Sequence, residues 1–204
     1  TSFDIRTCKP PFVRLARGQV WQVPTFVQLE AFVTATPPAA WLARRDYVSP
    51  GLRADWETSA KEADLAALAN GRRILDIQLS MLKPMADAGV PILAGTDTSS
   101  EIWVFAGYSL HRELELFVEA GLSPLQAIQT ATLNPRTYAG PDRGKSLIRA
   151  GERTDLVLFA ADPTADIANL ATIRGVVARG LYHDRASLDA LLVDAKLRAR
   201  NAGR

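Results

Sequence analysis

The sequence has few of the residues that build cross-linked or metal-rich folds. Its 204 residues contain a single cysteine, Cys8, and only two histidines, His111 and His183. One cysteine excludes an internal disulfide and any cysteine-rich zinc site.

Strong net charge and long apolar runs are also missing. The 24 basic residues nearly balance the 22 acidic ones, so the chain has no field to attract nucleic acid or anionic lipid, and we expect neither partner. No apolar run approaches the roughly 20 residues that cross a bilayer, and the N-terminus has no signal-peptide pattern. The chain begins at Thr1, which we interpret as a lost N-terminus. A cytoplasmic location is favoured, and a signal peptide on the parent protein stays open.

The sequence does contain an apolar run that ends in a carboxylate. Residues 91–98 read Pro-Ile-Leu-Ala-Gly-Thr-Asp-Thr, which predicts a buried strand that carries Asp97 at its C-terminal end. α/β enzymes place their chemistry at this end of their strands. Asp97 is then a metal ligand or proton acceptor at the mouth of a β/α barrel. The alternative is that Thr96 or Asp97 only caps the next helix.

The preceding segments predict a parallel α/β arrangement. A strand is predicted at 19–27. Helical periodicity over 60–88, interrupted near Asn70-Gly71, predicts one long helix or two short ones, and a short loop connects this helical segment to the strand at 90–97. This order is half of a β-α-β unit, with helices covering a parallel sheet. The irregular stretch 30–59 is either a binding lid or a surface excursion with its own hydrophobic cluster.

Two helices follow, and beyond Gly140 the sequence changes from helical patterns to short strand patterns. A helix is predicted at 110–119, and a second begins with Ser123 as its cap and ends before Asn134-Pro135. Beyond Gly140, short strands are predicted at 146–148, 156–159 and 175–178, and a closing helix spans 187–199 with Ser187 as its cap and leucines on its apolar side.

Three motifs in this order resemble the C-terminal part of the amidohydrolase superfamily. They are Gly-Thr-Asp at 95–97, Ser-Leu-His-Arg-Glu-Leu at 109–114, and Glu-Ala-Gly-Leu-Ser-Pro at 119–124 with Ala-Thr-Leu-Asn-Pro at 131–135. The similarity covers about 19–182 and points to the imidazolonepropionase-like and prolidase-like branch. It implies an α/β fold: the last two strands of a TIM-like β/α barrel with their helices, plus strands of a small β-sandwich.

The resemblance also divides the chain and assigns a chemistry. It implies a partial barrel at 1–140, sandwich strands at 141–183 and a C-terminal helix at 184–204. The implied activity is metal-dependent hydrolysis of a C–N bond in an amide, cyclic amide or dipeptide. The expected partner is accordingly a small amide or peptide-like substrate.

Asp97 matches the acid at the end of the eighth barrel strand. In the family this acid ligates a divalent metal, with zinc the expected ion here, and takes the proton from the metal-bound water. Thr98, Trp103, Tyr108 and His111 are expected to contact substrate or to support the site from the loop that closes it.

The other family ligands have no match in this sequence. They are a His-x-His pair on the first strand, a carboxylated lysine or glutamate on the fourth, and histidines on the fifth and sixth. Only two barrel strands are found where a barrel has eight. We therefore expect a truncated, inactive fragment that lacks its N-terminal portion.

Two alternatives remain open. The chain could be a non-catalytic partial barrel that acts as an assembly or binding module, with exposed strand edges completed by another copy in an oligomer. It could also be a self-contained α/β enzyme that uses Asp97 and His111 as a metal-independent acid and base pair.

Overall fold

The computed structural model describes residues 4–34, 36–62, 64–98, 102–140, 148 and 155–202. The strand predicted at 146–148 lies outside these residues, apart from Ile148. None of the described helices is long and apolar enough to cross a membrane. The first half of the described chain contains η1 (Ile5–Cys8), α1 (Lys9–Arg17), α2 (Phe26–Phe32), α3 (Ala39–Leu42), η2 (Arg45–Tyr47), α4 (Pro50–Lys61) and α5 (Leu65–Asp87). The second half contains α6 (Tyr108–Glu119), α7 (Pro124–Ala131), α8 (Leu133–Ala139), β1 (Leu156–Phe159), η3 (Ile167–Ala171), β2 (Ile173–Ala178), β3 (Leu181–Asp184) and α9 (Arg185–Asn201).

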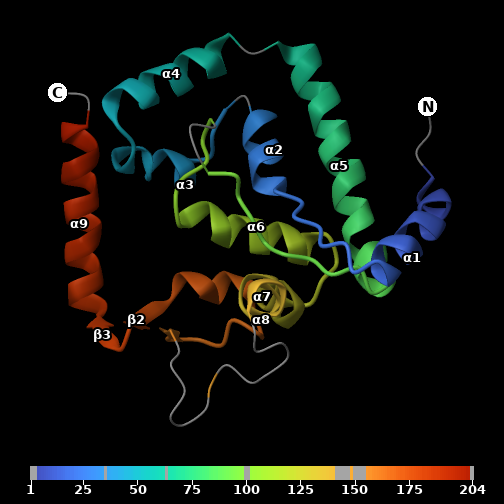
Figure 1. Ribbon diagram of the computed structural model, residues 1–204. Coiled ribbons are helices and arrows are strands. Elements are labelled where there is room, and N and C mark those ends of the chain that lie inside the picture. Colours follow the sequence, from blue (N-terminus) through green and yellow to red (C-terminus); the bar gives the residue numbers. More distant parts are fainter. Residues whose placement is uncertain are drawn as a thin grey trace.

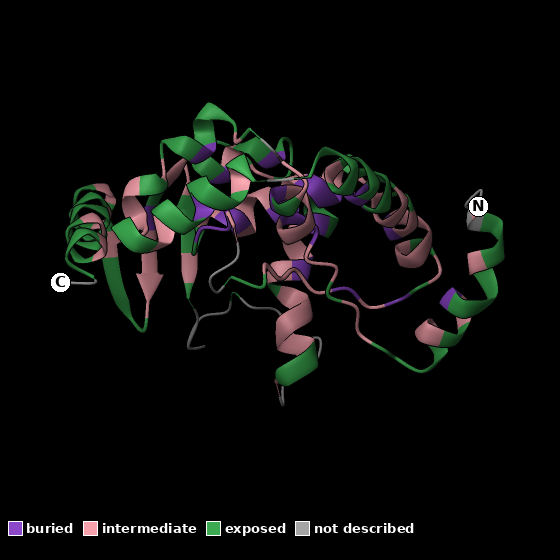
Figure 2. Cartoon of the chain, turned by 90° about the horizontal axis from the view of Figure 1, so that it is seen from above, coloured by how far each residue is buried: buried purple, intermediate pink, exposed green. Residues whose placement is uncertain are grey.

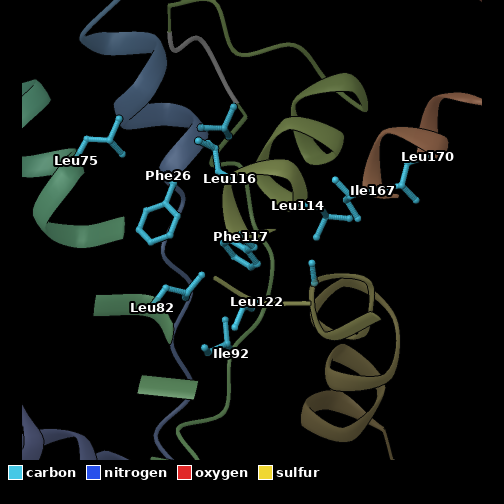
Figure 3. Packing of buried hydrophobic residues seen from close by; sticks show 12 residues of the cluster. Phe26, Leu75, Leu82, Ile92, Leu114, Leu116, Phe117, Leu122, Ile167 and Leu170 are labelled. Carbon is cyan, nitrogen blue, oxygen red and sulfur yellow. The ribbon is translucent and has the colours of Figure 1, made fainter. Parts of the chain in front are cut away.

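Helix α6 lies at the centre of the fold, with α2 on one side and α7 on the other (Figure 1). The main hydrophobic cluster forms where α2, α5, α6 and α7 meet. Leu82 and Phe117 are fully buried there, and the rings of Phe26 and Phe117 meet edge to face with centroids 5.7 Å apart. Figure 3 shows these side chains converging with Ile92 and Leu122. Burial of this apolar surface is the main term that holds the helices together.

Two extended segments run parallel beside this cluster. Gln22 and Ile92 form a parallel bridge, in which the Gln22 N–H donates to the Pro91 carbonyl at 2.9 Å and the Leu93 N–H donates to the Gln22 carbonyl at 2.9 Å. The predicted direction and pairing are confirmed, but the predicted lengths, 19–27 and 90–97, are wrong. Pro24 has no N–H for a ladder, and the chain is already helical at Phe26.

The prediction that 30–59 is irregular is wrong, because most of this stretch is helical. Ser49 accepts a hydrogen bond from the Leu52 N–H, and Pro50 takes the first position of α4, which is a favourable helix start. The stretch also forms a second hydrophobic cluster, whose buried members are Ala31, Trp41, Trp56, Trp103, Val104 and Phe105. A hydrophobic cluster is therefore present, but Trp103, Val104 and Phe105 come from the loop after Asp97, and the choice between a binding lid and a surface excursion stays a prediction.

The structure decides between the two alternatives left open for 60–88. Helix α5 is continuous through Gly71, so the chain forms one long helix from Leu65. A Cβ at position 71 would lie 2.6 Å from the Val33 side chain, so glycine lets the two segments touch.

The predicted cap at Ser123 is confirmed, and Gln126 completes a capping box with it. The helix ends at Ala131, before Asn134-Pro135 as predicted. The predicted reason is wrong, because the chain breaks at Thr132 (φ −128°, ψ −76°) and Asn134 is itself helical in α8, which begins at Leu133. Pro135 thus falls in a first helical turn, where its missing N–H costs little.

The strands near the C-terminus form an antiparallel sheet in the order β1-β2-β3. β1 and β2 were predicted, and β3 was missed. Arg179 and Gly180, both with positive φ, form the two-residue turn between β2 and β3, a geometry that suits hairpins. Asp184, rather than Ser187, caps α9 by accepting the Ser187 N–H at 2.8 Å.

The predicted closing helix is present as α9, but its apolar side is not buried, because this helix has no buried residue in the described chain. Leu191 and Leu197 are 55% and 51% exposed. Figure 2 shows α9 mostly exposed, near the C-terminal end of the chain.

Candidate functional site

Asp97 lies just beyond the parallel bridge, at the C-terminal end of its segment. Its side chain is exposed and its backbone is left-handed, with φ at 48°. The Gln28 amide, in α2, donates to Oδ2 of Asp97 at 3.1 Å. Because α2 follows the other extended segment, both segments bring a polar side chain to the same point. The next described helix starts at Tyr108, with Gly107 at its cap position, so the capping interpretation of Asp97 is wrong.

The start of α2 is fixed by a side chain from α6. Thr25, at the N-cap position of α2, is left-handed (φ 51°) and makes no side-chain cap. Instead, Glu113 accepts from the Phe26 N–H through Oε1 at 3.1 Å and from the Val27 N–H through Oε2 at 2.7 Å. These N–H groups would otherwise lack partners, because the first turn of a helix has no intrahelical acceptors for them.

Glu113 is completely buried. Burial raises the pKa of this carboxyl from its ordinary value of 4.5 to about 7, although the bonds from the Val27 and Phe26 N–H groups lower it in part. Burial disfavours the charged form, whereas hydrogen bonds from N–H groups favour it. Burial is the larger effect here, so the cap carries a proton over much of the acidic range.

The neighbouring Arg112 joins the same two helices further along α2. Its guanidinium donates to both carboxylate oxygens of Glu30, at 2.9 and 2.7 Å, and also to Glu119 at 2.7 Å. The hydrogen bond to Glu30 is the main cause that raises the pKa of Arg112. A bidentate arginine pair is among the stronger charged contacts. Helix α6 therefore holds α2, and with it Gln28, at two places.

Sequence reasoning missed Gln28, Arg112 and Glu113 as parts of this arrangement. One signal was present: Glu113 lies four residues before Phe117, on the apolar face of its helix. A charged residue on a buried face requires a partner. No local pattern identifies that partner, because it lies 86 and 87 residues away.

The other predicted site residues fall into two groups. Thr98 stays near Asp97, and its hydroxyl lies 2.5 Å from that of Thr96. Trp103 is buried in the second cluster, 5.5 Å from the Trp56 ring. Tyr108 lies under the Arg44 guanidinium, whose Cζ is 3.3 Å from the ring centroid.

His111 is half-buried on α6. Burial is the main cause that lowers its pKa; Glu115 raises it and Arg44 lowers it. The Arg44 guanidinium thus acts on both His111 and Tyr108. Roles for Thr98, Trp103, Tyr108 and His111 at substrate stay predictions.

The described residues do not by themselves fit a metal site. Within them, no group of three or more histidine, cysteine, aspartate or glutamate side chains is placed to hold an ion. A zinc site usually needs three or four protein ligands. Asp97 can supply one ligand, and its observed polar partner is the amide of Gln28.

Comparison with known proteins identifies the family. A model described as the amidohydrolase family matches residues 34–181. The chain belongs to this family. The adenine deaminase of Ligilactobacillus salivarius is 33% identical over 123 residues, which cover 55% of this chain and 21% of that protein. The ochratoxinase of Aspergillus niger is 32% identical over 131 residues, covering 62% of this chain and 25% of that protein.

A solved structure of bottromycin amidohydrolase is similar over most of this amidohydrolase chain. The match has a TM-score of 0.70 at 25% identity and covers 88% of this chain and 40% of that one. The α/β fold and the family inferred from the motifs are therefore confirmed. The chain spans about a fifth to a quarter of the length of the curated relatives named above.

Proposed function

We propose that this chain is the Asp97-bearing part of a hydrolase that cleaves C–N bonds in a small amide, cyclic amide or peptide-like substrate. One observation carries the proposal: Asp97 follows a parallel strand bridge in a chain of the amidohydrolase family, and Gln28 holds its carboxylate. The carboxyl ends of parallel strands are where such folds collect their reacting groups.

In this proposal Asp97 accepts a proton from the water that attacks the substrate. Gln28 donates to Oδ2, which orients the carboxylate and leaves Oδ1 for the proton. The hydrogen bonds of Glu113 to α2 keep Gln28 in position. A divalent metal, with zinc our proposed ion, would require ligands beyond the described residues.

The proposed architecture is the end of a β/α barrel. Residues 1–140 would form its last two units, 141–183 would contribute strands to a small sandwich, and 184–204 the closing helix. The parallel bridge and the antiparallel order β1-β2-β3 support this division. Since Asp97 is the one acid that the described residues bring to the proposed site, we expect no hydrolysis from the purified 204-residue chain alone.

The test is to purify the native protein that contains this chain and to measure its mass, metal content and hydrolysis of adenine, ochratoxin and an Xaa-Pro dipeptide. We expect hydrolysis of at least one substrate and a loss of about 100-fold or more in kcat for Asp97→Asn, typical of a removed proton acceptor. The control is Glu57→Gln, which removes an exposed charge on α4, away from Asp97 and Gln28. Equal activity of Asp97→Asn and the control would overturn the role of Asp97.

A second candidate function is a non-catalytic assembly module. It is favoured by the side chains of Val20 and Val23, which are 46% and 49% exposed beside the bridge at Gln22. A cavity of about 210 Å³ separates this segment from Met81 on α5. An open strand edge has unpaired N–H and C=O groups, and with apolar side chains beside them it favours pairing with another strand.

Light scattering on the purified chain tests this candidate. It predicts a discrete oligomer that Val23→Lys converts to monomer, while Val157→Lys, which changes an exposed valine of β1, leaves it intact. A monomer in the wild-type chain contradicts the candidate.

A further inference from the structure

A cavity of about 490 Å³ lies between α4 and the first turn of α5, away from the parallel bridge. Phe32 of α2 and Ile102, in the loop after Asp97, form part of its wall. Its volume lies within the range of about 300 to 1,000 Å³ that is usual for small-molecule sites. Gln28 and Phe32 are one turn apart on α2, so the cavity and the Asp97 carboxylate adjoin the same face of that helix.

The wall of this cavity is mainly apolar and is held in place by aromatic packing. Trp56 and Leu68 line it. The Trp56 ring is 97% buried and packs 5.5 Å from Trp103 and 5.3 Å, edge to face, from Phe105. A wall with fixed side chains favours binding because little conformational entropy is lost when a ligand enters.

The charged groups that line the cavity are both acidic. They are Asp55 on α4 and Asp64 at the start of α5, and no lysine, arginine or histidine lines the cavity within the described residues. Asp64 uses one oxygen, Oδ1, to accept the Ala66 N–H at 2.9 Å. The other oxygen and the exposed carboxylate of Asp55 are left to face a ligand.

We propose that this cavity binds a small organic cation, namely an arylalkyl amine. Its apolar body packs on Trp56 and Leu68, and its ammonium group lies between the carboxylates of Asp55 and Asp64. An aromatic face beside two carboxylates attracts an ammonium group and repels an anion. The inference is independent of the proposed hydrolysis, since binding is measured without turnover.

Calorimetry on the 204-residue chain at pH 7, supported by tryptophan fluorescence, tests the proposal with three ligands that share one body. They are 2-phenylethylamine, the uncharged 2-phenylethanol and the anionic 3-phenylpropanoate. We expect the amine to bind about tenfold more tightly than the alcohol, because two carboxylates attract it, and the anion to bind most weakly. Equal affinities for amine and anion, or no binding of the amine, would overturn the proposal.

Variants locate the site. Asp55→Asn should weaken amine binding by about fivefold, the upper range for a partly exposed charge pair, and leave alcohol binding unchanged. The matched control, Glu57→Gln, removes the same charge from an exposed position on α4 that does not line the cavity. Equal weakening in both variants would show a general charge effect and overturn the assignment.

Two further variants keep the test decisive if Asp55→Asn fails to fold. Asp64→Asn keeps a good helix cap. It should weaken binding of the amine without changing the helical circular dichroism signal. Ala60→Leu places extra methyl groups in the cavity wall and should abolish binding of both the amine and the alcohol. Unchanged binding in a folded Ala60→Leu variant would place the ligand elsewhere.

Discussion

The carboxylate of Glu113 acts as an N-cap for a helix on which it does not lie. It binds the first N–H groups of α2 from the neighbouring helix α6, and Thr25 supplies no cap of its own. The position of Gln28, and through it the orientation of Asp97, therefore depends on one buried glutamate.

Glu113→Gln should destabilise the protein by about 1 to 3 kcal/mol at pH 5. The amide keeps one acceptor oxygen, but its NH2 group then faces the other backbone N–H, and a buried donor is left without a partner. Urea unfolding followed by circular dichroism measures the loss. Glu119→Gln, at a 55% exposed position on the same helix, should cost less than about 1 kcal/mol, and similar losses in the two variants would contradict the cap.

The same carboxyl should make stability depend on pH. Because its pKa is raised from 4.5 to about 7 in the folded state, the folded protein holds the proton more tightly than the unfolded chain. This stabilisation is complete below pH 4.5 and is lost as the pH rises through 7, with a total of about 3 kcal/mol.

The measurement is the difference in unfolding free energy between wild type and Glu113→Gln from pH 4.5 to 8. The difference should shrink as the pH rises. His111, whose pKa is lowered, contributes in the opposite direction, because its stabilisation is lost as the pH falls below 6.5. Both proteins contain His111, so its contribution cancels in the difference. A difference that is constant with pH would show that Glu113 does not titrate in this window.

At the scale of single residues, the sequence identified Asp97 but not the residues that hold it in place. Asp97 ends an apolar run, a pattern that eight consecutive residues make visible. Gln28 and Glu113 act through contacts that span 69 and 87 residues, and periodicity carries no information over such distances. The family resemblance located the 109–114 motif without explaining its glutamate.

Among the elements, the two parallel segments meet where Gly95 faces Val23. A Cβ at Gly95 would lie 2.5 Å from Cγ1 of Val23. Gly95→Ala should therefore lower stability by about 1 to 3 kcal/mol through overpacking. Thermal unfolding measures this loss, with Gly51→Ala in α4 as the control. The new methyl group at position 51 meets nothing within 4 Å, so this variant should be stabilised by up to about 1 kcal/mol. Shifts in Tm of the same sign in both variants would contradict this packing.

Elements were predictable where local chemistry decides them. Ser123 and Pro124 begin α7 as expected, and β1 matches its apolar run. Tertiary context decided the rest. The parallel segments are shorter than their composition predicts, and the aromatic stretch around Trp41 is helical and shares a buried cluster with Trp103 and Phe105. The exposed leucines of α9 show that helical spacing of apolar residues does not require burial.

At the scale of the whole molecule, α2 connects the two hydrophobic clusters. Phe26 and Val27 belong to the main cluster, and Ala31, one turn later, belongs to the second. Three of the four tryptophans lie in the second cluster, so tryptophan fluorescence reports mainly on it. Circular dichroism reports on all the helices.

Leu82→Ala, a fully buried change in the main cluster, should cost about 2 to 5 kcal/mol. If α2 couples the clusters, the urea midpoints from fluorescence and from circular dichroism should fall together, as in a single cooperative transition. A fall in the circular dichroism midpoint alone would mean that the second cluster unfolds independently. Leu65→Ala, at a 75% exposed position on the same helix, is the control and should change neither midpoint appreciably.

The cap on α2 also sets an order of events during synthesis. Phe26 leaves the ribosome 87 residues before Glu113, an interval of roughly 4 to 17 s at ordinary rates of translation. Throughout that time the first turn of α2 has only water to satisfy its N–H groups. The beginning of α2, and with it the final placement of Gln28, is thus completed only after α6 has emerged, so the nascent chain acquires its proposed site late.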